Sequence, residues 1–84
     1  MYEIIFRNPA KRFIKGLSKD SQIKILKQIE KLGKNPRIGK HLTGNLRGLF
    51  RLRFDNFRIV YKFNNYELIV YVLNIGDRGS VYNK

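Results

Sequence analysis

The chain has 84 residues, of which 43% are hydrophobic and 13% aromatic. We expect one folded domain, residues 1–84, around one core, and the composition argues against a disordered chain. It contains no Cys, which excludes disulfides, thiolate nucleophiles and Cys-based zinc sites, and a cytoplasmic location is expected. The formal net charge of +12 favours a polyanionic partner, although charge alone does not choose among RNA, DNA and an acidic protein.

The first predicted element is a strand over Tyr2–Phe6, which is apolar and contains β-branched residues. This stretch is too short for a secretion signal, and no stretch approaches the roughly 18 apolar residues of a membrane span, so no membrane partner is expected. Asn8 is expected to cap a helix that has Pro9 at its first position. We expect this helix to run to about Lys15 and to end at the glycine that follows.

A second helix is predicted to begin at a Ser18 or Asp20 cap. Apolar residues recur in it at helical spacing with lysines beside them, and these apolar residues are Ile25, Ile29 and Leu32. Gly33 and Pro36 are expected to end the helix. The two helices should form a hairpin with one apolar stripe and one basic face.

From residue 46 onward the hydrophobic period changes from helical to alternating. Residues 50–54 and 57–63 alternate in this way, which predicts two half-buried strands joined by a two-residue turn at Asp55-Asn56. Asn64-Asn65 indicates a second tight turn before Leu68–Ile75, an apolar run that is typical of a central strand. The sequence therefore predicts an α+β fold: an N-terminal strand, a two-helix hairpin and a three-stranded antiparallel meander, with one sheet packed on the helices.

The predicted hairpin register brings arginines together on one face of the sheet. With a turn at 55–56, Arg53 lies directly across from Arg58, and Arg51 lies two positions along the same face. Like charges placed opposite each other destabilise a hairpin, so folding does not explain the arrangement, whereas a bound anion would. The alternative is a solvated polar face, which is usual for antiparallel sheets. The scarcity of acids on this face favours an anion site.

The same register, extended through the second turn, predicts two more pairs. Tyr71 should lie across from Arg58, where its ring could stack on a base or form one wall of the anion site. Glu67 should lie across from Lys62 as an ordinary surface ion pair.

The C-terminal segment could complete this face. Arg78 would lie at the end of the sheet and Tyr82 could fold back over it, although a frayed tail is the alternative. His41, the single histidine, is expected to lie in a loop without a catalytic role. The six acids show no metal-ligand spacing, so neither a metal nor a cofactor is expected.

Four segments of the sequence resemble the RelE/ParE toxin superfamily. They are LTGNLRGLFRLR at 42–53, FRIVY at 57–61, IGDR at 75–78 and VY at 81–82. The family pattern begins with a Leu-x-Gly segment that leads into an aromatic-basic-aliphatic-basic strand. An aromatic-Arg-aliphatic-aliphatic-Tyr strand follows, and then a Gly-x-Arg segment and a terminal Tyr. The resemblance spans essentially the whole chain. It implies a RelE-like fold and a ribosome-dependent messenger RNA endonuclease that an antitoxin holds inactive.

The resemblance also implies site residues. The catalytic set carried over by position is Arg51, Arg53, Arg58, Arg78 and Tyr82. The implied reaction is attack by a ribose 2′-hydroxyl on the adjacent phosphate. Arg58 and Arg78 would supply positive charge, Arg51 and Arg53 would position the backbone, and Tyr82 is the candidate base. The further residues expected to contact RNA are Arg47, Lys62 and Tyr71.

The implied partners are the ribosome with its message and a RelB-like acidic antitoxin. The antitoxin would form a hetero-oligomer with this chain by laying a helix in an apolar groove between the helical hairpin and the sheet. Two alternatives remain open. One is the ParE branch, which shares the fold and inhibits DNA gyrase without cutting RNA, and the other is a non-catalytic RNA-binding module.

Overall fold

The computed structural model describes residues 1–77, so the predicted positions of Arg78 and Tyr82 lie outside the described residues. Within this range the helical segments are α1 (Asn8–Lys15), α2 (Lys19–Lys34) and the short 3-10 turns η1 (Pro36–Ile38) and η2 (Gly44–Leu46). The strands are β1 (Glu3–Phe6), β2 (Lys40–His41), β3 (Phe50–Phe54), β4 (Phe57–Asn64) and β5 (Ile69–Asp77). The predicted α+β fold is confirmed, with the short strand β2 as an addition.

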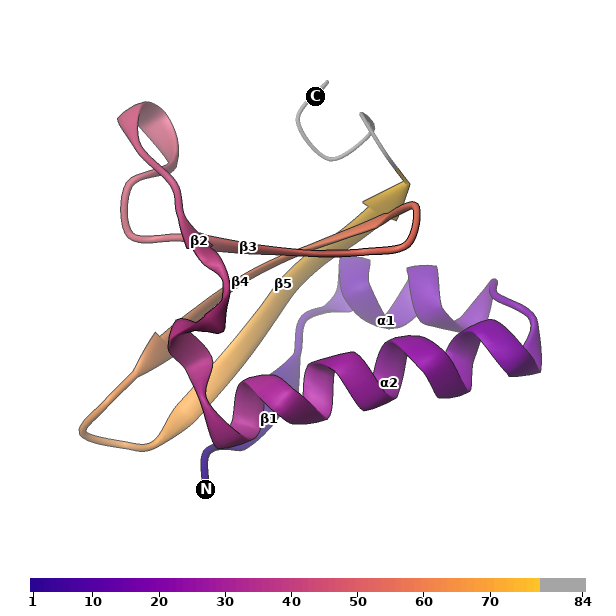
Figure 1. Ribbon diagram of the computed structural model, residues 1–84, viewed down its shortest axis with the longest axis horizontal. Helices are drawn as coiled ribbons and strands as arrows, with labels where there is room; N and C mark the ends of the chain where they lie inside the picture. The colour runs from indigo at the N-terminus through magenta and orange to yellow at the C-terminus, as the bar shows by residue number, and fades with distance from the viewer. Residues whose placement is uncertain (78–84) are drawn as a thin grey trace.

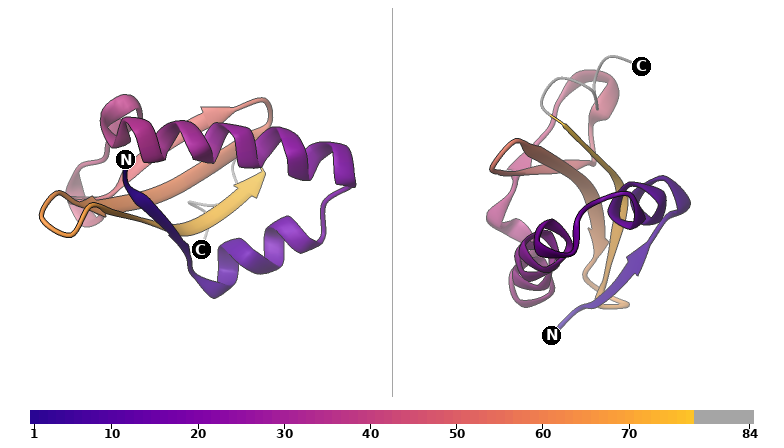
Figure 2. Two further views of the ribbon diagram at one scale, coloured as in Figure 1. Left: turned by 90° about the horizontal axis from the view of Figure 1, so that it is seen from below. Right: turned by 90° about the vertical axis from the view of Figure 1, so that its right-hand side faces the viewer.

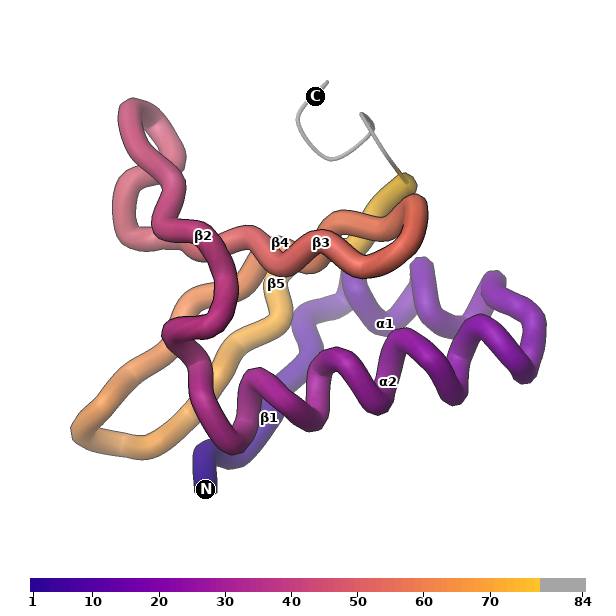
Figure 3. The backbone as a smooth tube through the Cα atoms, in the orientation of Figure 1, coloured from indigo at the N-terminus to yellow at the C-terminus, as the bar shows by residue number. Residues whose placement is uncertain are grey.

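The described strands form one sheet in the order β1-β5-β4-β3-β2. β4 runs antiparallel to both β3 and β5, as the predicted meander requires. β1 pairs with β5 in parallel, so β5 has a partner on each side. This central position accounts for the nearly continuous apolar run in β5. The path of the chain through these strands can be followed in the tube view (Figure 3).

Both helices lie on one side of the sheet, and the segment that contains η2 rises on the other side (Figure 1). Figure 2 shows α1 and α2 as a hairpin laid across the sheet. The apolar stripe of α2 is buried as predicted, and its core partners on β4 and β5 are Ile59, Tyr61, Val70, Val72 and Ile75. Burial of a large aliphatic side chain contributes about 1.5–3 kcal/mol, so this layer supplies much of the stability. None of the helices in residues 1–77 combines the length and the apolar character needed to cross a membrane.

The two helices begin differently. Ser18 caps α2, and its hydroxyl accepts a hydrogen bond from the Ser21 N–H at 3.2 Å, which confirms one of the two predicted caps. The prediction that Asn8 caps α1 is wrong, because Asn8 is already helical. The cap position is Arg7, whose carbonyl accepts a hydrogen bond from the Lys11 N–H at 3.0 Å. The helix therefore begins one residue earlier than the sequence predicts.

The turn between β4 and β5 is longer than the predicted two residues. Asn64 is still paired, with Ile69, and its side-chain oxygen accepts hydrogen bonds from two N–H groups of the turn at 2.8 and 2.9 Å. An Asn side chain that caps a turn in this way offers the backbone an alternative to the ladder. Glu67 therefore lies in the turn, and its predicted pairing with Lys62 is wrong.

A β-bulge in β5 shifts the register again. Tyr61 lies opposite Val72, whereas its neighbour Val60 lies opposite Asn74, so Leu73 is an extra residue on β5. The bulge keeps apolar side chains of β5 in the core on both sides of Leu73. It also changes which residues meet on the opposite face of the sheet.

Two hydrogen bonds of Tyr61 link the segment that follows α2 to the sheet. Its side chain is fully buried, and its hydroxyl donates a hydrogen bond to Pro36 O at 2.6 Å and accepts one from the Gly39 N–H at 3.0 Å. Burial raises the pKa of the Tyr61 phenol above its ordinary value, and the hydrogen bond from Gly39 opposes this in part. The phenol therefore acts as a neutral structural link and holds β2 in place beside β3.

Tyr61→Phe is expected to lower the free energy of unfolding by about 1–3 kcal/mol, because Pro36 O and the Gly39 N–H lose their partner. The raised pKa adds a pH dependence. As the pH rises above about 10, the unfolded chain loses the Tyr61 proton before the folded chain does, so stability falls there. The variant should lack this part of the alkaline decline. Denaturant titrations at neutral and alkaline pH measure both effects, and Tyr66→Phe, which alters a fully exposed ring, is the matched control. Equal stability of Tyr61→Phe and the parent at neutral pH would contradict the assignment.

Candidate functional site

The sheet face that points away from the helices, here called the open face, carries the candidate site. Ile59 and Tyr61 of β4 point into the core, so the alternate β4 residues must lie on the open face. Their neighbours in register on β2, β3 and β5 lie on the same face. The polar open-face residues of these strands include Lys40, Arg51, Arg53, Arg58, Lys62 and Tyr71.

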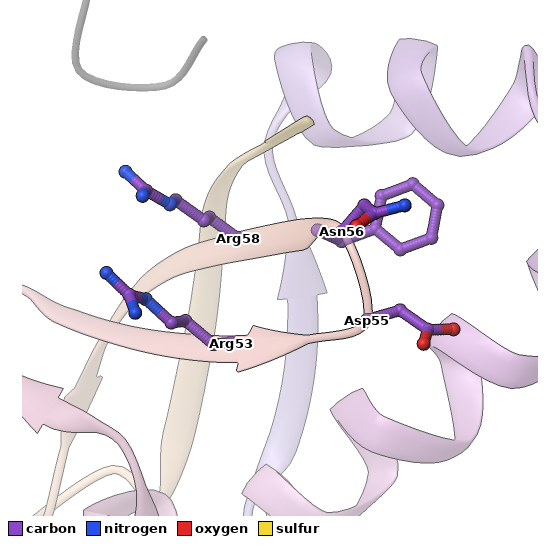
Figure 4. A pocket seen from close by; sticks show the side chains of 5 residues that line it. Arg53, Asp55, Asn56 and Arg58 are labelled. Carbon is purple, nitrogen blue, oxygen red and sulfur yellow. The ribbon is translucent and has the colours of Figure 1, made fainter. Parts of the chain in front are cut away.

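The predicted arginine pair is confirmed. Arg53 and Arg58 are direct partners in the β3–β4 ladder, next to the two-residue turn at Asp55-Asn56. Figure 4 shows both guanidinium groups extending to the same side of the hairpin, while the Asp55 carboxylate points away from them. A pocket of about 240 Å³ opens here, and its lining residues are Arg53, Asp55, Asn56, Phe57 and Arg58. Two adjacent cations beside a polar hollow favour the binding of an anion.

Arg51 extends the cluster along β3. It lies opposite Val60, which is only 5% exposed although it faces away from the core. The Arg51 Nε atom is itself buried and has no hydrogen-bond partner among the residues that the structure describes. A buried donor without a partner is destabilising, typically by about 1–3 kcal/mol. Arg51 thus adds a third arginine to this face, with the base of its side chain packed into the sheet.

Lys40 is an open-face cation that sequence reasoning missed. β2 places Lys40 directly opposite Arg51, on the side of Arg51 away from Val60. The sequence predicts a loop here, because β2 has two residues and no alternating pattern of its own. The signal that could have found it is the Gly39 that precedes it, since a glycine next to a short strand often marks a close approach of two backbone segments.

Tyr71 lies in a different place from the one predicted. The longer turn puts it opposite Lys62, and the bulge further along puts Gly76 opposite Arg58, so the predicted pairing of Tyr71 with Arg58 is wrong. The Lys62 ammonium lies 5.6 Å from the centre of the Tyr71 ring. Arg7, which sequence reasoning did not select, lies on the same ring with its guanidinium carbon 5.3 Å from the centre. These are cation–π contacts.

The remaining predicted site residues are peripheral or lie beyond residue 77. Arg47 is exposed and follows η2, in the segment that rises beside the open face (Figure 1). His41 is in β2 and not in a loop, and its ring stacks on Phe50 with the centres 4.9 Å apart. Arg78 and Tyr82 lie outside the described residues. Within residues 1–77, no group of three or more His, Cys, Asp or Glu side chains is placed to hold a metal ion.

The open face is suited to binding a phosphodiester backbone. Arginine binds phosphate with two parallel hydrogen bonds, and several arginines from adjacent strands can contact one phosphate from different directions. The described part of this face provides positive charge and hydrogen-bond donors. The one carboxylate in the lining of the pocket is that of Asp55, and it points away from the two guanidinium groups (Figure 4).

Three comparisons relate the chain to known proteins. Residues 4–84 match the family model described as a ParE-like toxin of type II bacterial toxin–antitoxin systems. A protein from Escherichia coli described as a RelE-like toxin is 33% identical over 89 residues, which cover 98% of this chain and 90% of that protein.

Solved structures show the same fold. The RelBE2 toxin–antitoxin complex from Mycobacterium tuberculosis contains a chain that matches with a TM-score of 0.83 and 25% identity, over 92% of this chain and 98% of that chain. The isolated RelE toxin from Escherichia coli matches with a TM-score of 0.77 and 20% identity, over 98% of this chain and 92% of that chain.

Proposed function

Because the chain belongs to the ParE-like toxin family of type II bacterial toxin–antitoxin systems, we propose that it is a RelE-type toxin that stops translation by cutting messenger RNA on the ribosome. The observation that carries the proposal is the convergence of Arg51, Arg53 and Arg58 on the open face. A gathering of positive charge on one face is expected where a polyanionic substrate binds. The ribosome and its message place this activity in the cytoplasm.

The proposed reaction needs no metal. The oxygen of a ribose 2′-hydroxyl attacks the adjacent phosphorus and gives its proton to a base. The bond to the 5′-oxygen breaks, and the leaving oxygen takes up a proton from an acid or from water, so the products are a 2′,3′-cyclic phosphate and a 5′-hydroxyl. Arg58 and Arg78 stabilise the negative charge on the crowded phosphate, and Arg51 and Arg53 position it. Tyr82 is the proposed base, because neighbouring arginines favour the phenolate form of a tyrosine. The RNA strand on either side is held by Lys62 and Arg47.

The proposed neutralising partner is an acidic RelB-like antitoxin. The RelBE2 neighbour from Mycobacterium tuberculosis was solved as a toxin–antitoxin complex. An apolar pocket of about 220 Å³ is the proposed docking point for apolar side chains of an antitoxin helix, and its lining residues are Phe6, Lys11, Ile14, Lys15 and Leu26. The lysines at its rim match an acidic partner.

A second candidate function is inhibition of DNA gyrase, which the ParE-like description of the matching family model favours. Two assays distinguish RNA cleavage from gyrase inhibition. The purified protein is added to translating ribosomes and, separately, to gyrase with relaxed plasmid. We expect codon-spaced cuts in the message and unchanged supercoiling. An intact message together with lost supercoiling would assign the gyrase function, and an intact message with normal supercoiling would leave a binding module.

A further inference from the structure

The open face carries a second group of cations that the arginine cluster does not include. Arg7 follows β1, Lys62 lies on β4, and both contact Tyr71 of β5. Lys62 is four residues along β4 from Arg58, which corresponds to roughly 13 Å of extended strand. Because Lys62 lies against the Tyr71 ring on the β5 side and Arg53 lies on β3, the two groups of cations are separate along and across the sheet.

Backbone contacts fix the positions of both cations beside Tyr71. The Arg7 backbone N–H donates to Val72 O at 2.9 Å, which fixes Arg7 beside β5 at the point where α1 begins. Lys62 is the direct ladder partner of Tyr71. The ring of Tyr71 is half-buried and lies within 5.6 Å of both positive groups. Tyr71 thus has one cation against its ring from the β1 side of β5 and one from the β4 side.

Both cations gain from contact with the ring, and the result is a concentration of positive charge around one side chain. No carboxylate is the ladder partner of Lys62 or of Tyr71 among the described residues. A negatively charged group held by both cations would gain from both charges. The Arg53–Arg58 pair offers the same opportunity, and both groups lie on one face of one sheet.

We propose that Arg7, Lys62 and Tyr71 form a second phosphate subsite, which binds the RNA backbone away from the phosphate that is cut. Tyr71 acts in it as a positioning residue for the two cations and not as a stacking surface for a base. The inference rests on the proposed function, because it takes RNA as the polyanion. Together the two subsites define a track across β3, β4, β5 and the end of β1.

The test measures binding separately from cleavage. The probe is a fluorescent single-stranded oligonucleotide of 2′-O-methyl nucleotides, which cannot be cut because its 2′-oxygen carries no proton. Affinity is measured at several salt concentrations for the parent, Arg7→Gln, Lys62→Gln, Tyr71→Phe and Tyr71→Leu. Arg12→Gln and Lys31→Gln, which remove exposed charges from the helices, are the matched controls.

Each lost phosphate contact should reduce the slope of log affinity against log salt by about 0.7. We expect that reduction for Arg7→Gln and Lys62→Gln, a similar one for Tyr71→Leu, and none for Tyr71→Phe or the controls. Arg7→Gln should also have less effect in a Tyr71→Leu background, since the ring no longer places Arg7.

Three results would overturn the subsite: no oligonucleotide binding by the parent, slopes of Arg7→Gln and Lys62→Gln that equal those of the controls, or a Tyr71→Leu variant that binds more weakly with an unchanged slope. The last result would assign Tyr71 to base stacking. Failure of the proposed function is distinguishable, because it appears as an intact message on ribosomes whatever the slopes are.

Discussion

Arg58→Ala is expected to reduce the rate of message cleavage on ribosomes by about 10²–10³-fold, the loss typical when one preorganised donor to a developing negative charge is removed. Arg58 lies beside the pocket, directly across from Arg53, where its guanidinium group can reach a bound phosphate. Arg58→Lys keeps the charge but gives up the planar pair of donors, so an intermediate loss is expected. Single-turnover cleavage of a labelled message, followed on purified translating ribosomes, measures the rates.

The matched control removes one positive charge from a part of the surface that is not on the open face. Lys24→Ala on the exposed face of α2 should cleave at the parent rate. Thermal unfolding of each variant shows whether it is folded at the assay temperature. A folded Arg58→Ala variant that cleaves at the parent rate would contradict the assignment of Arg58 to the reacting phosphate.

Gly39→Ala is expected to have the largest effect on stability. A Cβ atom at Gly39 would overlap the Tyr61 hydroxyl and would lie 2.8 Å from the backbone oxygen of Arg51, and neither the buried ring nor the β3 backbone can move without cost. Overpacking together with the loss of the hydrogen bond to Tyr61 should lower the free energy of unfolding by about 2–4 kcal/mol. For a domain of this size that corresponds to a fall of roughly 8–30 °C in Tm, which calorimetry measures.

Gly16→Ala is the matched control for this prediction. Its added Cβ would meet only backbone oxygens at 3.6 and 3.8 Å, an ordinary contact, and Gly16 has a φ of −82° that alanine adopts readily. The control should therefore be neutral or slightly stabilising. A Tm for Gly39→Ala equal to that of the control would show that β2 does not depend on the close approach of Gly39 to Tyr61.

The arginine cluster could be predicted from the sequence because its contacts are local. The alternation of apolar and basic residues over β3 and β4 assigns each side chain to a face, and the turn at Asp55-Asn56 then fixes the register. Arg53 and Arg58 are only five positions apart, so no long-range information is needed to pair them. The Ser18 cap and the apolar stripe of α2 were predictable for the same reason.

The rest of the open face depends on pairings between distant parts of the chain. Arg7 reaches Tyr71 only because β1 adds to β5 in parallel, and Lys40 reaches Arg51 only because Tyr61 holds the segment after α2 against β3. Neither pairing has a local pattern. The position of Tyr71 was predicted wrongly because the turn, capped by the Asn64 side chain, is longer than expected. The bulge at Leu73 then shifts the partner of Arg58 by one more residue. A register error of this kind grows with distance from the turn that fixes it.

The central proposal is that the open face holds a phosphodiester while the neighbouring 2′-hydroxyl attacks it. The most direct test compares two messages on ribosomes, one with ribose throughout and one with a single 2′-deoxy nucleotide on the 5′ side of the mapped cut. We expect the first message to be cut to a 2′,3′-cyclic phosphate and a 5′-hydroxyl, and the second to stay intact at that position. Equal cutting of both messages, or no cutting of either, would contradict the account.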